Sequence, residues 1–108
     1  SGAGIAVRLI HECLLGIRKT ASVLVIDPVI PKALDGLCAD IELAGKPVQV
    51  VYRVAASGSG PTALTLNGTA LPFEREPNPY RAGGAAVPMA ALRRLLTAAA
   101  NTLEVQLQ

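Results

Sequence analysis

Few side chains in this sequence could carry out catalysis. The one histidine, His11, is followed by Glu12, which is a neighbour in sequence and not a partner on the same face of a helix. Cys13 falls on the apolar side of the helix expected there, away from His11, so a Cys–His nucleophile pair is disfavoured. One histidine and two distant cysteines, Cys13 and Cys38, do not make a zinc site. We expect two buried, unpaired thiols and no metal or other cofactor.

The carboxylates are the remaining candidates for acid–base chemistry. Paired carboxylates can cleave glycosidic bonds, but the pattern predicts no cleft around the ones found here, which are Asp27, Asp35, Asp40, Glu42, Glu74 and Glu76. Asp27 stands before Pro28, as is typical of a turn. The glycine-rich stretch 57–61 lacks the lysine and the strand–helix context of a phosphate loop. The sequence therefore predicts no catalytic residue in this chain.

Aromatic side chains, on which sugar rings stack in carbohydrate-binding modules, are scarce. The chain has no tryptophan, and Tyr52 and Phe73 fall within strand patterns that favour the core. Tyr80 is the one aromatic residue expected in a loop. Asn67-Gly68-Thr69 matches a glycosylation sequon but also an ideal hairpin turn, and we interpret it as the turn.

Composition limits the broad class of protein. A chain of 108 residues, 51% hydrophobic, is one domain that can bury its own core. Its net charge of +2 comes from scattered basic residues, which argues against a nucleic-acid partner. No apolar run reaches the roughly 20 residues that span a bilayer. With no recognisable signal peptide, a cytoplasmic location is expected.

The elements that would position these residues are mostly strands. Apolar residues at helical spacing predict an amphipathic helix over 3–18 with an unusually wide apolar arc. Alternating or β-branched runs predict strands at 22–26, 37–43, 48–54, 63–66, 69–73, 85–87 and 103–107. Turns are expected at 44–46 and 67–68, and 74–84 is rich in turn residues. Pro88 would begin a short helix that Asn101 ends. The fold class expected is a two-sheet β-sandwich, jelly-roll-like or immunoglobulin-like, with an N-terminal helix and a short helix near the C-terminus.

Two neighbouring motifs carry a resemblance to a known family. Leu14-Leu-Gly-Ile-Arg18 and Leu24-Val-Ile-Asp-Pro-Val-Ile-Pro31 resemble the junction in inverting sugar phosphorylases related to cellobiose phosphorylase, where the last helix of an (α/α)6 barrel meets a C-terminal β domain. Residues 66–68 and 78–84 are more similar to the branch of cyclic β-1,2-glucan synthases and 1,2-β-oligoglucan phosphorylases. The chain departs from the family at Val29, where cysteine is common, and at 34–37, where the family often has Trp-x-Gly-Phe.

This resemblance implies two regions: residues 1–19 as the terminal helix of a missing barrel, and residues 20–108 as the β domain. It also implies phosphorolysis of a β-glucosidic bond by a parent enzyme whose catalytic aspartate lies outside this chain, and it leaves open an association of that parent with the inner membrane. Ser1 and Gly2 would match the family's phosphate-binding step, although they would equally suit a helix cap.

The role expected for the chain is thus structural: it would cover the barrel and meet β-glucan only indirectly. A stand-alone carbohydrate-binding module and a protein–protein interaction domain remain as alternatives. The wide apolar arc predicts self-association through residues 5–17, with Val7, Leu14 and Leu15 left exposed or covered by another molecule.

Overall fold

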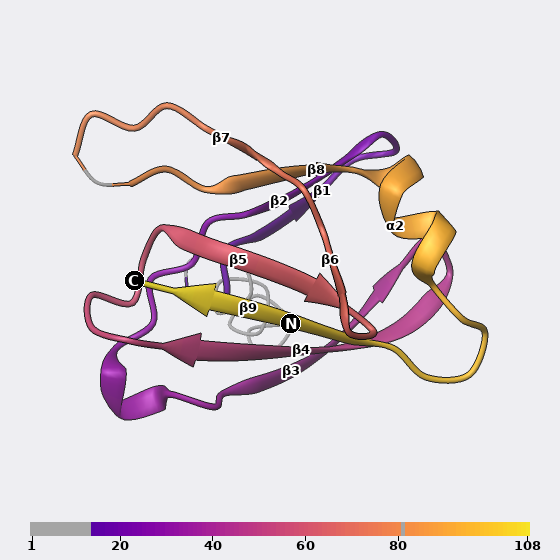
Figure 1. Cartoon of the computed structure of the whole chain (residues 1–108), viewed down its shortest axis with the longest axis horizontal. Coiled ribbons are helices and arrows are strands. Elements are labelled where there is room, and N and C mark those ends of the chain that lie inside the picture. Colours follow the sequence, from indigo (N-terminus) through magenta and orange to yellow (C-terminus); the bar gives the residue numbers. More distant parts are fainter. Residues whose placement is uncertain (1–13, 81) are drawn as a thin grey trace, which may run out of the picture.

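The computed structural model describes residues 14–80 and 82–108, which form two β-sheets (Figure 1). The four-stranded sheet is antiparallel, in the order β1 (Ile17–Lys19), β2 (Val23–Ile26), β8 (Ala85–Pro88), β7 (Glu74–Arg75). The five-stranded sheet has the order β3 (Cys38–Leu43), β4 (Lys46–Val54), β9 (Thr102–Leu107), β5 (Pro61–Leu66), β6 (Thr69–Ala70). Its strands β4 and β9 run parallel, and its other pairs are antiparallel.

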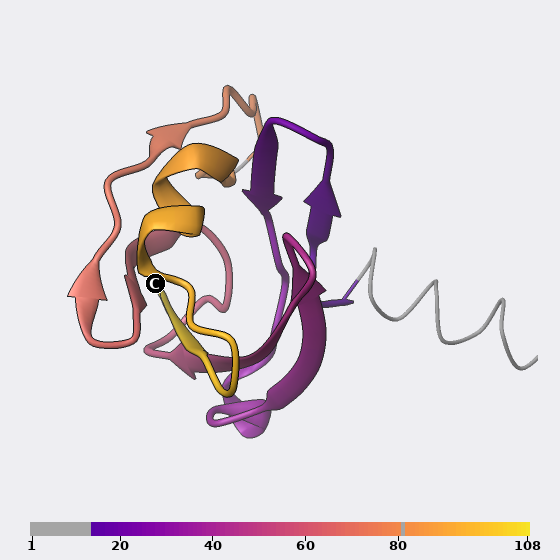
Figure 2. The same cartoon turned by 90° about the vertical axis from the view of Figure 1, so that its right-hand side faces the viewer.

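The core lies between the two sheets, because each strand turns every second side chain inward. Leu24 and Ile26 of β2 share one hydrophobic cluster with Tyr52 of β4 and Val105 of β9. Helix α2 (Met89–Leu95) closes one end of this space, as the turned view in Figure 2 shows, and it contributes Met89 and Leu92 to the cluster. The prediction of a mainly β chain with a short helix near its C-terminus is confirmed.

The predicted connections between strands are also confirmed. Asn67 and Gly68 both have positive φ, at 52° and 83°, as a type I′ turn requires. Residues 27–31 belong to no helix and no strand, so Pro28 and Pro31 lie outside both sheets. A 3-10 helix, η2 (Lys32–Leu34), follows them. Among the residues that the structure describes, no helix is long and apolar enough for a membrane crossing.

The helix predicted over 3–18 is wrong at its C-terminal end. Residues 3–13 lie outside the described residues, but Ile17–Lys19 is strand β1, and Gly16 before it has a φ of +64°. Helical periodicity could not anticipate the tertiary pairing of these residues with β2. The prediction that Leu15 is exposed or covered by another molecule is wrong too, because Leu15 is 4% exposed and belongs to the core cluster of the chain itself.

Three smaller expectations need correction. Cys38 is an exposed free thiol and not a buried one, because it lies on the outward side of β3, where alternate residues face solvent. The strand expected over 69–73 is only Thr69–Ala70, and a further short strand, β7, lies in the turn-rich stretch. Asn101 does not cap α2 itself; it bonds to Thr97, just beyond the helix, and the Asn67 side chain donates to the carbonyl of Leu95, 3.0 Å away.

Candidate functional site

The structure does not gather the residues with catalytic potential into one centre. Ser1, Gly2, His11 and Cys13 lie outside the described residues. Within residues 14–80 and 82–108, no group of three His, Cys, Asp or Glu side chains could hold a metal ion.

Among the carboxylates, Asp35 and Glu76 make contacts that hold the fold together. The Asp35 carboxylate accepts a 2.7 Å hydrogen bond from the backbone N–H of Val54. Glu76 forms a 2.9 Å ion pair with Arg18. These contacts tie loops to strands, so these two carboxylates serve the fold.

The aromatic side chains do not form a sugar-binding platform. Tyr52 is fully buried, and Phe73 packs against the core with the Arg75 guanidinium 5.7 Å from its ring centre. Tyr80 is 94% exposed in the loop that follows β7. One isolated ring provides a single stacking surface, so the described residues do not support sugar binding by an aromatic cluster.

The feature with the most clearly defined contacts is a junction between residues 14–16 and the segment that follows β2. The backbone N–H of Asp27 donates to the Gly16 carbonyl at 2.9 Å, and the N–H of Val29 donates to the Leu14 carbonyl at 3.3 Å. These bonds extend the pairing of β1 with β2 beyond the ends of both strands. We call Leu14, Leu15, Gly16 and their partners Asp27, Val29 and Tyr52 the N-terminal junction.

Gly16 is required at the junction by its conformation and by lack of space. Its φ of +64° suits glycine far better than other residues. A Cβ at this position would lie 2.2 Å from the carbonyl carbon of Asp27. The two backbone segments can therefore touch only because Gly16 has no side chain.

Tyr52 holds the junction from the core side. Its phenol, fully buried among apolar residues, donates a 2.8 Å hydrogen bond to the Leu15 carbonyl. Burial raises the pKa of Tyr52 well above its usual value, so the phenol stays protonated and remains a donor. One core residue of β4 thereby fixes the backbone at the start of the described chain.

Sequence reasoning missed this junction as a structural unit, although its signal was present. The two motifs behind the family resemblance, residues 14–18 and 24–31, are the two segments that the structure bonds together. Their proximity in sequence with a short gap between them is typical of two paired strands joined by a tight turn. The role of the Tyr52 hydroxyl had no comparable signal, because it depends on a contact between residues 37 positions apart.

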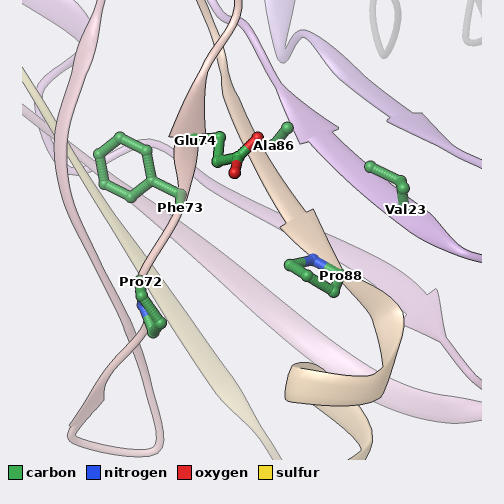
Figure 3. Close-up of a pocket in the computed structure, with 6 residues that line it drawn as sticks. All are labelled: Val23, Pro72, Phe73, Glu74, Ala86 and Pro88. Carbon is green, nitrogen blue, oxygen red and sulfur yellow. The ribbon is translucent and has the colours of Figure 1, made fainter.

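A second feature is a hollow on the outer face of the four-stranded sheet (Figure 3). Its volume is about 360 Å³, and it is lined by Val23, Pro72, Phe73, Glu74, Ala86 and Pro88. The lining is apolar apart from the carboxylate of Glu74. It offers no nucleophile and no acid–base pair, so it suits contact with another surface better than chemistry.

Comparison with known proteins gives concordant results. A family model described as the glycoside phosphorylase C-terminal domain matches residues 16–106. The chain is 33% identical over all 108 residues to a 1,2-beta-oligoglucan phosphorylase of Listeria innocua serovar 6a. It spans 9% of that protein's length. The matched family region begins at Gly16, inside the N-terminal junction.

Proposed function

The chain belongs to the family of glycoside phosphorylase C-terminal domains, and on that premise we propose that it is a non-catalytic domain that braces the upstream catalytic part of a β-1,2-glucan phosphorylase. The observation that carries this proposal is the N-terminal junction. There, Gly16 and Tyr52 fix the incoming backbone against the core within three residues. Bonds of this kind would transmit the rigidity of the β domain to whatever precedes it in the polypeptide.

Further parts of the proposal rest on the family. The two sheets would form a β-sandwich that packs beside an (α/α)6 barrel, and the catalytic aspartate would lie in that barrel. Residues 1–13 would belong to the barrel's last helix, with Ser1 and Gly2 at its start near bound phosphate. The reactive side chains of the described residues are scattered and do not form one centre, which supports a structural role and supports no reaction within this chain.

The bracing role is tested in the full-length polypeptide that carries this chain. Gly16→Ala forces a Cβ against the backbone of Asp27, whereas Gly45→Ala places one at a similar φ, +76°, with nothing within 4 Å. Both variants have the backbone strain of positive φ, so any difference between their effects comes from the clash at the junction. We expect Gly16→Ala to shorten the half-life of phosphorylase activity at elevated temperature severalfold more than Gly45→Ala does.

The same experiment discriminates bracing from participation in the active site. A bracing domain leaves the KM for phosphate and for the glucan unchanged in the surviving enzyme. If Gly16→Ala raised either KM while the half-life stayed equal to that of Gly45→Ala, the junction would belong to the catalytic site and the proposal would be wrong.

A further inference from the structure

The two sheets differ sharply in the side chains on their outer faces. On the five-stranded sheet, Asp40, Gln49 and Thr102 lie side by side in one row of paired residues, and all three are exposed. This polar row is what a sheet face in contact with water carries.

The outer face of the four-stranded sheet is apolar instead. Inward positions of β2 and β8 are occupied by core residues, so Val23, Val25, Ala86 and Pro88 turn outward. Val25 pairs with Ala86 in the row that also contains Arg18 and Glu74 at its two edges. We call Val23, Val25, Ala86 and Pro88, together with the hollow beside them, the apolar face.

Charged groups border the apolar face, and the ion pair between Arg18 and Glu76 crosses it from one edge of the sheet to the other. Arg18 at one edge pairs with Glu76, which follows β7 at the other edge. The Glu74 carboxylate lines the hollow between β7 and β8, where Figure 3 shows it beside Ala86. An apolar centre with a polar rim is the usual anatomy of a protein interface.

We infer that the apolar face docks on the upstream part of the same polypeptide, which makes it the contact surface of the bracing domain proposed above. Two observations select this occupant. The matched relative has about nine-tenths of its length outside the region that corresponds to this chain. The backbone before β1 also reaches the domain at the edge of this same sheet, one strand away from Val25. A short connection would therefore bring the preceding polypeptide to the edge of the apolar face.

Thiol labelling of a single position tests this inference. Ala86→Cys puts a thiol in the centre of the apolar face, in a Cys13→Ser background. Native Cys38, exposed on the five-stranded sheet, serves as the internal reference. Labelling with a maleimide is followed peptide by peptide by mass spectrometry, in the 108-residue chain, in the full-length polypeptide, and in both after unfolding in urea.

We expect the rate at position 86, relative to that at Cys38, to fall at least tenfold in the full-length polypeptide compared with the chain alone. Equal relative rates in the two proteins would overturn the inference. So would protection in the isolated chain that grows with its concentration, which would identify a second copy as the occupant. Protection that requires added β-1,2-glucan oligosaccharide would identify a sugar and would overturn it as well.

A pair of charge substitutions keeps the inference testable if the isolated chain does not fold. Ala86→Arg in the full-length polypeptide would place a charge in the docked face, and Gln49→Arg places the same charge on the solvated face. Ala86→Arg should lower the midpoint of thermal inactivation and Gln49→Arg should not; equal midpoints would overturn the inference. The Gly16→Ala experiment does not involve the apolar face. Its result can therefore contradict the bracing role while the docking surface stands, and the labelling result can contradict the docking surface while the bracing role stands.

Discussion

At the scale of single residues, Tyr52 links the interior of the domain to its N-terminal junction. Tyr52→Phe keeps the ring but leaves the buried Leu15 carbonyl without its donor. The loss should lower the free energy of unfolding by about 1–2 kcal/mol. Urea unfolding measures this change, and Tyr80→Phe is the matched control because its side chain is 94% exposed. Equal losses in the two variants would contradict the role assigned to the Tyr52 hydroxyl.

The same residue predicts how stability depends on pH. Burial raises the pKa of Tyr52 in the folded state, whereas in the unfolded chain the phenol titrates near its usual value of about 10. Above that pH the unfolded state loses a proton that the folded state retains. Stability should therefore fall as pH rises above about 10, by about 1.4 kcal/mol per pH unit.

Unfolding midpoints at intervals between about pH 8 and about pH 11 check this dependence. Tyr52→Phe should remove most of the fall, since it has no phenolic proton to lose. If the wild type and the variant declined in parallel, Tyr52 would not be the group responsible.

Asn101 is buried, with 5% of its surface exposed, and its polar side chain connects three segments. Its amide donates to the carbonyls of Pro47 and Thr97, and its side-chain oxygen accepts from the backbone N–H of Thr97 and from the Asn67 amide. Asn101→Ala would leave several of these groups unsatisfied, at a cost of about 1–3 kcal/mol. Chemical unfolding measures this loss of stability, and Gln49→Ala, a substitution at an exposed neighbouring residue, is the control. Equal stabilities of the two variants would show that water replaces the network.

At the scale of elements, the hairpin of β5 and β6 depends on its two central residues. Gly68 has a φ of 83° and nothing within 4 Å of an added Cβ, so a substitution there tests conformation alone. Gly68→Val should destabilise the domain by about 1 kcal/mol or more. Thr69→Val, the next residue in the strand, should change the melting temperature little. An unchanged melting temperature in Gly68→Val would argue against the turn.

The sequence predicted those elements whose signals are local. Asn67-Gly68 specified its turn, and the β-branched runs at 22–26 and 48–54 specified their strands, because alternation and turn chemistry act within a few residues. Strand β1 was not predicted, because the apolar residues up to residue 18 have helical spacing. The pairing of β1 with β2 forms only in the folded domain. The Asn101 network and the apolar face depend on contacts between distant segments, which no local sequence pattern predicts.

At the scale of the whole molecule, the domain should bind and brace without catalysing. The purified 108-residue chain, given inorganic phosphate and a β-1,2-glucan oligosaccharide, should release no glucose 1-phosphate above the enzyme-free background. The physical reason is that the described residues offer neither a metal cluster nor a nucleophile or acid–base pair in their hollow. Coupled detection of glucose 1-phosphate measures this directly. Release proportional to the concentration of the chain would refute a purely structural role.

The position of β9 has a consequence for biosynthesis. This strand follows all the other described strands in the sequence, yet it lies between β4 and β5 in the sheet. In a nascent chain still held in the ribosome before Thr102, β4 can pair only with β3 and β5 only with β6, so each would expose one open edge. The domain can complete its larger sheet only after synthesis has passed Leu107, so a prematurely terminated polypeptide would present two open strand edges that chaperones and proteases can recognise.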